Sequence, residues 1–230
     1  MAMIITVANE KGGVAKTTAS CELALLAQHN GYKTVLIDTD HQQGATKFKL
    51  RRDQVSAELP PLRVVPIVGK SVGSQIVDFA RENDIVVVDA GGRDSQEMRL
   101  AMLVSHLVLI PTSEGDADTD GLNKMAMLIN ESRLRNPELK AWIMPARIPP
   151  TNFGATRALI EEELNKPIDP SVPNERIRDV LGTVTRCFLV QRSAYKTAYG
   201  WGRSVREMDG RDPKAASEVQ AFYQEVVDHG

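Results

Sequence analysis

The sequence predicts a doubly wound α/β fold, in which a mostly parallel β-sheet carries helices on both faces. Two observations support this prediction. Short β-branched runs recur along the first two thirds of the chain, and they are almost continuously apolar, which is typical of parallel strands covered on both sides. Segments of helical length, with apolar residues at i, i+3 and i+4, separate these runs, and alternating β and α units favour a parallel sheet.

The expected strands follow one another at residues 3–8, 33–38, 62–68, 84–90, 106–111 and 139–146. A helix is expected at 17–30, where Gly31 is a stop signal, and another at 121–134. The last helix is expected from about Pro213 to Asp228, with Asp212 as its N-cap. Its inward apolar stripe consists of Val219, Tyr223 and Val226.

The chain has 230 residues, of which 42% are hydrophobic and 25% charged, and this is enough material for one substantial core. We therefore expect a single domain over residues 1–230. Pro167, Pro170 and Pro173 break one segment into a loop, and only short helical segments follow before the last helix. Residues 171–230 are accordingly expected to form a mostly helical C-terminal portion of that domain.

Composition excludes several classes of protein. A net charge of −2 argues against a uniformly basic nucleic-acid coat, although it says nothing of a local patch. Cys21 and Cys187 are the only cysteines and lack C-x-x-C spacing, which argues against a disulfide framework or a cysteine metal cluster and favours a reducing compartment. The start does not read as a signal peptide, and no apolar run approaches the roughly 20 residues of a membrane span. These features predict a cytoplasmic protein.

Residues 9–18, N-E-K-G-G-V-A-K-T-T, join the first strand to the first helix as a phosphate-binding loop would. Gly12 and Gly13 let backbone N–H groups approach phosphate, and the helix adds its positive end at the same point. Lys16 can reach the β and γ phosphates, and the Thr17 hydroxyl can ligate Mg²⁺. The pattern predicts a P-loop NTPase with ATP and Mg²⁺ as cofactors. The expected nucleotide-binding residues are Lys11, Gly12, Gly13, Val14, Ala15, Lys16, Thr17 and Thr18.

Two residues of this loop depart from the usual pattern, G-x-x-x-x-G-K-[ST], and the loop also has an additional lysine. Glu10 and Ala15 occupy positions where glycine is usual. The alanine is the milder change, but it is strained if the backbone there needs a positive φ. Lys11, at the entrance of the loop, is not needed to cradle phosphate and therefore calls for another explanation.

Carboxylates follow two of the expected strands. Asp38 and Asp40 follow the second strand, and Asp89 follows the fourth, directly before A-G-G-R-D. Ligands of open α/β sheets bind at the carboxyl ends of the strands. We therefore expect these carboxylates and the P-loop to form one site.

The form K-G-G-x-x-K-[ST]-T resembles the deviant Walker A motif of the ParA/MinD family of ATPases. V-L-I-D-T-D-H-Q-Q-G, at 35–44, is similar to the switch I segment of that family, and I-V-V-V-D-A-G-G-R-D-S, at 85–95, is similar to its Walker B motif and switch II. Residues 191–226 resemble its closing segment. The resemblance thus spans nearly the whole chain.

The resemblance implies a slow, partner-stimulated ATPase in which Lys11, Lys16 and Asp40 are catalytic. Lys11 would reach across a dimer to the partner's nucleotide, and such a contact accelerates related reactions by about 10³- to 10⁵-fold. Asp40 would orient or activate the attacking water, and the following residue, His41, replaces the usual proline. The implied metal residues are Thr17, Asp89 and, through water, Asp38.

The family pattern also implies roles for neighbouring segments. Gly91 and Gly92 would form a hinge that responds to the γ-phosphate. Arg93 is either a switch residue or a surface charge. The loop at 146–152 and the region around Pro173 would flank the adenine.

Charge is distributed unevenly in the last third of the chain. Basic residues outnumber acidic ones between 171 and 206, whereas acidic residues predominate from 207 to 230. Arginines interleaved with aromatic residues can hold DNA phosphates without reading bases, and the family binds DNA through a comparable surface. The alternative is a solvated face with the aromatic residues in the core. The expected DNA contacts are Arg186, Arg192, Lys196 and Arg203.

Together, these features predict a ParA-like protein that dimerises on binding Mg·ATP, binds DNA nonspecifically over the nucleoid and is released when a ParB-like or other adaptor stimulates hydrolysis. We expect a plasmid as cargo because the architecture is short. The alternatives are a metabolic enzyme of ATP-dependent ligase type, a MinD-like membrane-associated ATPase and a binding module without turnover. The acidic last segment argues against attachment to anionic lipid.

Overall fold

The computed structural model describes residues 2–55, 59–92, 94–113, 119–169, 171, 174–209 and 211–229. Arg93 and Pro173, for which the sequence suggested a switch role and an adenine contact, lie outside the described residues. The strands are β1 (Met3–Val7), β2 (Thr34–Asp38), β3 (Val64–Pro66), β4 (Ile85–Asp89), β5 (Leu107–Thr112), β6 (Lys140–Ile148), β7 (Thr183–Val184) and β8 (Leu189–Val190).

Helices alternate with these strands along most of the chain. They are α1 (Lys16–His29), α2 (Gly44–Val55), α3 (Val72–Glu82), α4 (Gln96–Met102), α5 (Thr119–Arg133), α6 (Phe153–Leu164), α7 (Ile177–Leu181), α8 (Ser193–Gly200), the 3₁₀ helix η3 (Val205–Glu207) and α9 (Pro213–His229).

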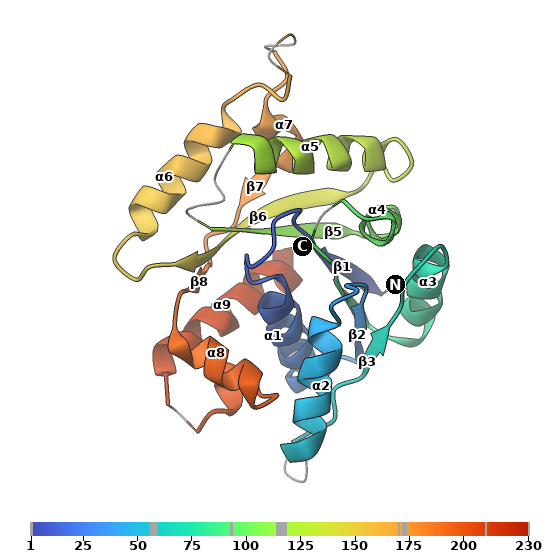
Figure 1. The fold of residues 1–230 in the computed structure, drawn as a ribbon, viewed down its shortest axis with the longest axis vertical. Helices are drawn as coiled ribbons and strands as arrows, with labels where there is room; N and C mark the ends of the chain where they lie inside the picture. Colours follow the sequence, from blue (N-terminus) through green and yellow to red (C-terminus); the bar gives the residue numbers. More distant parts are fainter. Residues whose placement is uncertain are drawn as a thin grey trace.

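The strands form an eight-stranded sheet in the order β3-β2-β4-β1-β5-β6-β7, and β8 pairs with β6 (Figure 1). Every pairing between these named strands is parallel. This arrangement confirms the predicted doubly wound α/β fold. Because β1 lies between β4 and β5, its carboxyl end opens at the centre of the sheet, where such folds bind their ligands.

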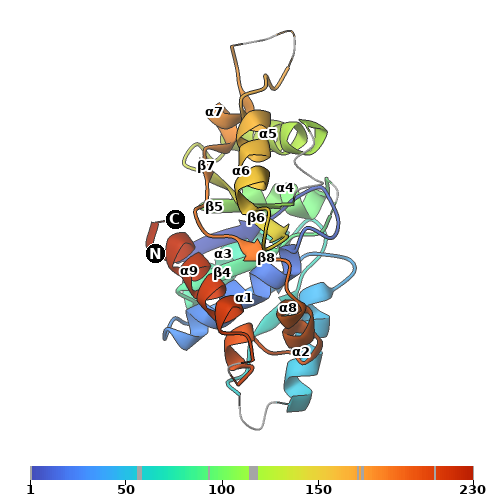
Figure 2. The ribbon, with the colours of Figure 1, turned by 90° about the vertical axis from the view of Figure 1, so that its left-hand side faces the viewer.

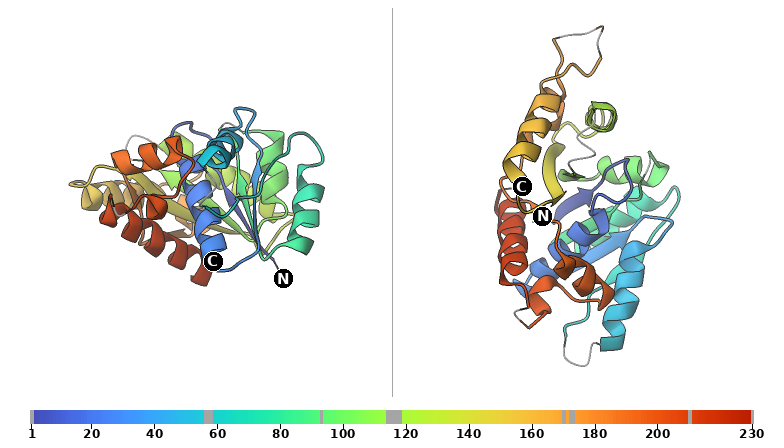
Figure 3. Two further views of the ribbon diagram at one scale, coloured as in Figure 1. Left: turned by 90° about the horizontal axis from the view of Figure 1, so that it is seen from below. Right: turned by 60° about the vertical axis from the view of Figure 1, so that its left-hand side comes forward.

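Helices cover both faces of the sheet, and alternate residues of each strand face opposite layers (Figure 3). In β1, Ile5 and Val7 pack in one cluster with residues of α1, α2, α8 and α9. On the opposite face, Ile4 packs with α3, and Ala8 packs with α4 to α7. Since both faces are buried, the strands read as continuous apolar runs in the sequence.

All six predicted strands form, with ends that differ from the predicted ones by at most two residues. The predicted last helix also forms as α9. The backbone N–H of Ala215 donates to Asp212 Oδ1 at 3.0 Å, and the predicted apolar stripe of α9 is buried. The strands β7 and β8 were not predicted, because two residues are too few to show a period.

The C-terminal segment is held against α2 by a buried ion pair. The Arg52 guanidinium, on α2, has no exposed surface and donates to both carboxylate oxygens of Glu207, each at 2.8 Å. Gly202 makes the approach possible, because a Cβ there would lie 2.2 Å from the Arg52 backbone nitrogen. As a result α8 lies beside α2 (Figure 2). Within the described ranges, no helix is both long enough and apolar enough to cross a membrane.

Candidate functional site

The loop between β1 and α1 is fixed from both sides. The buried side chain of Asn9 accepts the Lys11 backbone N–H at 3.0 Å and donates to the carbonyl oxygen of Pro111 at 2.7 Å. The Lys16 side chain is buried, and its Nζ donates to the Lys11 carbonyl oxygen at 2.7 Å. The Lys16 ammonium therefore lies at the entrance of the loop, where Lys11 begins the K-G-G sequence. Asn9 was not predicted, although it directly precedes the motif.

Ala15 has φ 70° and ψ 22°, which is the left-handed region of the backbone, and it precedes the first residue of α1. The strain predicted for an alanine at this position is therefore present. This conformation costs about 1–2 kcal/mol for a residue with a Cβ, whereas glycine adopts it without steric strain. Gly13, two residues earlier, has φ 79° and meets the same requirement without strain.

Asp38 and Asp89 end neighbouring strands and are register partners in the pairing of β2 with β4. Both side chains are buried. On the other side of β4, Asp89 is the partner of Val7, the last residue of β1 before the P-loop. The structure thus brings the two carboxylates and the loop to one edge of the sheet, as predicted.

Asp38 organises the segment that follows β2. Its Oδ2 accepts hydrogen bonds from the backbone N–H and the hydroxyl of Thr46, both at 2.8 Å, and its Oδ1 accepts the Asp40 N–H at 3.2 Å. These bonds tie the first turn of α2 to the end of the strand. The Asp40 side chain lies farther out and accepts the Gln42 N–H at 2.8 Å. A Cβ at Gly91 would lie 3.4 Å from Asp40 Cγ, so the two predicted switch segments are in contact.

Asp89 is the buried carboxylate with an incomplete set of partners. The pKa of Asp89 is raised from its usual 3.8 to about 7, chiefly by burial and also by the Asp38 charge, while the hydroxyls of Thr17 and Ser20 and the Lys16 charge oppose the rise. Oδ1 accepts the Ser20 hydroxyl at 3.1 Å, and Oδ2 has no hydrogen-bond partner among the described residues. An unpartnered buried oxygen beside a hydroxyl fits a hard divalent cation.

The number of protein ligands available at this site also suits Mg²⁺. Across the described part of the chain, no group of three or more His, Cys, Asp or Glu side chains could hold a metal ion by itself. Mg²⁺ is commonly held by one or two carboxylates, with water and substrate phosphates supplying the remaining ligands. Asp89 and Thr17 therefore fit a magnesium ion that arrives with a phosphorylated substrate.

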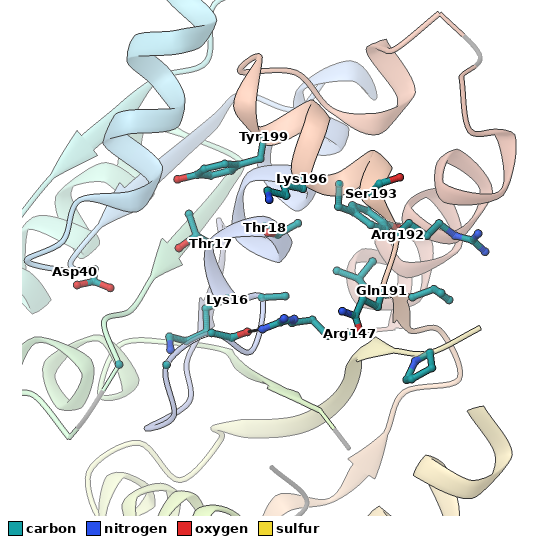
Figure 4. A pocket seen from close by; sticks show the side chains of 18 of the residues that line it. Lys16, Thr17, Thr18, Asp40, Arg147, Gln191, Arg192, Ser193, Lys196 and Tyr199 are labelled. Carbon is teal, nitrogen blue, oxygen red and sulfur yellow. Dashed lines mark hydrogen bonds between the residues drawn. The ribbon is translucent and has the colours of Figure 1, made fainter. Parts of the chain in front are cut away.

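A pocket of about 1100 Å³ opens over the loop (Figure 4). This volume slightly exceeds the usual range of about 300–1,000 Å³ for small-molecule sites and can hold a nucleotide. Of the predicted loop residues, all but Lys11 and Val14 line it, together with Asp40 and Gly92; the side chain of Val14 is buried. The opposite wall comes from the loop after β6 and from the start of α8. The predicted segment 146–152 contributes Arg147, Pro149 and Pro150.

The residues predicted for DNA contact are divided among different environments. Arg192 lines the pocket and is ion-paired with Glu218 of α9 at 2.5 Å, and its guanidinium points away from the P-loop (Figure 4). Lys196, on α8, is exposed and also lines the pocket. Arg203 is partly buried and donates to the Glu207 carbonyl oxygen at 3.2 Å, while Arg186 is exposed.

Of the aromatic residues at 195, 199 and 201, two face the interior. Tyr195 is buried, and the Tyr199 hydroxyl donates to the Gly44 carbonyl oxygen at 2.8 Å. Only Trp201 is exposed, with the Arg211 guanidinium 4.8 Å from the centre of its ring. Tyr199 therefore belongs to the packing of α8 against α2, and Tyr195 contacts Glu218 of α9. A single sequence cannot show which side chains face inward.

Comparisons with known proteins identify relatives along the whole chain. A family profile described as an AAA domain matches residues 2–83, which contain the P-loop and β2. The chain is 29% identical to the maintenance of carboxysome distribution protein A of Halothiobacillus neapolitanus, covering 98% of this chain and 97% of that protein. It is 21% identical to protein ParA of Rhizobium radiobacter, covering 94% and 91%.

The fold is also similar to that of a solved structure. The structure of a Cyanothece McdA variant in complex with ATP superimposes with a TM-score of 0.72, at 15% identity, and covers 99% of this chain and 96% of that one. At this identity the likeness concerns the arrangement of the sheet and helices. It extends beyond the P-loop to the C-terminal helices.

Proposed function

The chain belongs to the ParA/MinD family of deviant Walker A ATPases, and we propose that it positions a cargo in the cell by an ATP-dependent cycle of dimerisation and DNA binding. ATP and Mg²⁺ are its cofactors. One observation carries the proposal: the segment K-G-G-V-A-K-T-T runs from the loop after β1 into the first turn of α1, with a second lysine at its entrance and carboxylates from β2 and β4 beside it. The family relatives named above support a positioning role.

Each residue of the site has a part in this proposal. Lys16 and the loop N–H groups hold the phosphates, and Asp40, on the pocket wall, orients the attacking water. Thr17 and Asp89 hold Mg²⁺, which neutralises phosphate charge when bound. Asp38 adds its charge beside Asp89 and reaches the ion through water, while its hydrogen bonds keep Thr46 and α2 in place.

Lys11 links nucleotide binding to dimerisation. In the proposed dimer its ammonium contacts the partner's triphosphate, so that phosphate charge is neutralised in trans. ATP binding then builds the dimer face, and loss of the γ-phosphate dissolves it.

Three variants test this assignment. Lys11→Ala should retain ADP binding but lose about 10³-fold or more in the rate of phosphate release, because a trans cation acts mainly on the transferring phosphoryl group. Asp40→Ala should dimerise with ATP without turning it over, and Lys16→Ala should fail to bind nucleotide. Sedimentation with ADP and with ATP, beside a phosphate-release assay, measures all three. A Lys11→Ala protein that dimerises and hydrolyses ATP like the wild type contradicts the role in trans.

DNA binding is proposed for the ATP-bound dimer alone. Arg186 and Lys196 are the predicted contacts with exposed side chains, whereas Arg192 and Arg203 are engaged within the protein. Titration of duplex DNA with ADP, ATP or a nonhydrolysable analogue, at two salt concentrations, should give tight and salt-sensitive binding only with the triphosphates.

Substitution of the two exposed residues tests the DNA contact in the same titration. Arg186→Ala and Lys196→Ala should each lower the salt slope by about one. Lys214→Ala, which changes an exposed lysine of α9, is the matched control.

DNA affinity that does not depend on the nucleotide state rules out the proposed cycle. ATP turnover that responds to a small carboxylic acid but not to DNA indicates a ligase, and ATP-dependent binding to anionic vesicles indicates membrane association.

The cargo that we propose is a plasmid, moved through a ParB-like or other adaptor protein. A protein-bounded compartment is the second candidate, because the relative named for carboxysome distribution is 29% identical over nearly its whole length, compared with 21% for ParA. Deleting the gene in its host distinguishes the two. Faster plasmid loss supports the first cargo, and clustering of a normally dispersed compartment supports the second.

A further inference from the structure

Arg147 lies at an irregularity near the end of β6. Ala146 pairs with Leu189 and Ile148 pairs with Val190, and the register shifts between them. Both flanking residues are buried, whereas Arg147 is exposed and has φ 54°. A bulge of this kind turns one side chain out of the sheet and is common beside active sites. Here it turns Arg147 into the pocket over the P-loop.

The Arg147 guanidinium reaches the phosphate-binding loop. Its Nη1 donates to the Gly13 carbonyl oxygen, and a Cβ at Gly13 would lie 3.5 Å from the same nitrogen. Figure 4 shows the side chain extending from the end of β6 toward the loop that carries Lys16. The cation therefore lies where the loop faces the pocket, on the same side as Gln191, whose backbone N–H donates to the Ile148 carbonyl oxygen at 2.8 Å.

The charge of Arg147 is not matched within the described residues, where no carboxylate forms an ion pair with it. The other arginine of the pocket differs, since Arg192 is paired with Glu218. A left-handed backbone at a residue other than glycine costs about 1–3 kcal/mol and persists where the surrounding structure imposes it. A guanidinium presents a planar fork of donors that suits phosphate oxygens.

We propose that Arg147 binds the phosphate chain of the nucleotide held by its own P-loop, exchanging the Gly13 carbonyl oxygen for a phosphate oxygen. This inference rests on the proposed nucleotide binding. Each nucleotide would then be contacted by Arg147 of its own subunit in addition to Lys11 of the partner subunit. It also explains why a bulge and a strained residue occur at this point of β6. The competing explanation is that Arg147 only braces the loop.

Binding of Mg·ADP, followed by calorimetry, tests the proposal on the full chain. Arg147→Ala should weaken ADP binding by about 10- to 100-fold, the loss typical of a hydrogen bond to a charged group. Arg147→Lys should recover part of the affinity, because it keeps the charge but not the fork. Arg178→Ala is the matched control, since Arg178 is an exposed arginine of α7 that pairs with Glu161 and lies outside the pocket.

Thermal unfolding separates ligand contact from bracing. If Arg147 contacts phosphate, Arg147→Ala leaves the nucleotide-free Tm unchanged and reduces only the increase in Tm caused by Mg·ADP. A fall in the nucleotide-free Tm that accounts for the lost affinity supports bracing and overturns the proposal, as does ADP affinity within about twofold of the wild type. If the wild type binds ADP and Lys16→Ala does not, nucleotide binding stands whatever Arg147 does. If the wild type does not bind ADP, both proposals fail.

Discussion

The two halves of α1 face different clusters of buried charge. At its first turns, Ser20 and Lys16 lie beside Asp89, whose Oδ2 lacks a hydrogen-bond partner among the described residues. Farther along, Glu22 accepts the Ser204 hydroxyl at 2.6 Å and the Val205 N–H at 3.0 Å, one on each carboxylate oxygen. We call the first group the phosphate-side cluster, comprising Lys16, Asp38 and Asp89.

The second group is the brace cluster, comprising Glu22, Arg52, Ser204 and Glu207. The Glu207 carboxylate is fully used: besides Arg52, it accepts the Ser204 N–H at 2.8 Å and is bonded to the His29 ring at 2.7 Å. Burial raises the pKa of Glu207, but the hydrogen bonds from Arg52 and from the Ser204 N–H outweigh it, and the pKa lies below its usual value. This cluster joins α1 and α2 to the C-terminal segment.

The comparison shows that a raised pKa alone does not identify a ligand site. Burial is the largest cause of the shift for both Asp89 and Glu22, and the pKa of each is about 7. The two carboxyls differ in their surroundings. Asp89 Oδ2 lacks a hydrogen-bond partner among the described residues, and a pocket opens over the P-loop beside Asp89. A structural carboxylate has its partners within the fold, whereas a binding carboxylate is left to be completed by a ligand.

The largest effect is expected from breaking the brace cluster. Arg52→Ala leaves the Glu207 charge buried without its partner and should lower the free energy of unfolding by about 3–5 kcal/mol. Urea unfolding measures it. Arg81→Ala, which removes an exposed pair with Asp78, should cost at most about 1 kcal/mol. A loss for Arg52→Ala no larger than that of the control would show that the brace is not structural.

The pH dependence of stability should reflect both raised carboxyls. A carboxyl with a raised pKa in the folded state favours folding most when protonated, so its stabilisation is lost as pH rises toward the folded pKa. For the nucleotide-free protein, the free energy of unfolding should therefore fall between about pH 4 and pH 7, by at most about 1.4 kcal/mol per pH unit for each group. Denaturation at a series of pH values tests this, and stability that rises steadily over the window contradicts it.

Substitution of each carboxyl by its amide should sharpen the comparison, because the Asp89 and Glu22 variants should change the free energy of unfolding in opposite directions. Asp89→Asn removes a buried charge beside Asp38 and should stabilise the nucleotide-free protein at pH 8 by about 1–3 kcal/mol. It should also abolish the stabilisation conferred by Mg·ATP. Thermal unfolding with and without nucleotide reads out both effects.

Glu22→Gln should destabilise the protein by about 1–3 kcal/mol, since an amide nitrogen would face the Ser204 hydroxyl or the Val205 N–H, both of which donate to Glu22. Nucleotide affinity should be unchanged. If both amide variants shift stability in the same direction, the distinction between the two clusters is wrong.

The smallest effect is expected from the loop itself. Ala15→Gly relieves the left-handed strain and should raise the free energy of unfolding by about 1 kcal/mol, after the entropy of glycine is counted. Gly13→Ala should act in the opposite direction, because φ is 79° there. Chemical denaturation of the two variants, side by side, checks the sign. A destabilised Ala15→Gly protein would mean that the alanine is not strained.

Several features of the protein could be determined from its sequence alone. The P-loop, the parallel strands and the meeting of Asp38 with Asp89 follow from local patterns, because strand period and loop chemistry are written in adjacent residues. The rule that parallel strands end at one edge then brings these segments together. The sequence also indicated that Ala15 would be strained if its φ were positive, and the structure shows that φ is 70° there.

Only the tertiary structure decided where the remaining charges lie. Arg192 and Lys196, both predicted as DNA contacts, line the pocket over the P-loop, and Arg52 pairs with Glu207 across 155 positions. A bulge in β6 set the direction of Arg147. These outcomes depend on how α8 and the C-terminal segment pack against α2. The direction of a side chain and the identity of a distant partner are properties of that packing, and no local period in the sequence encodes them.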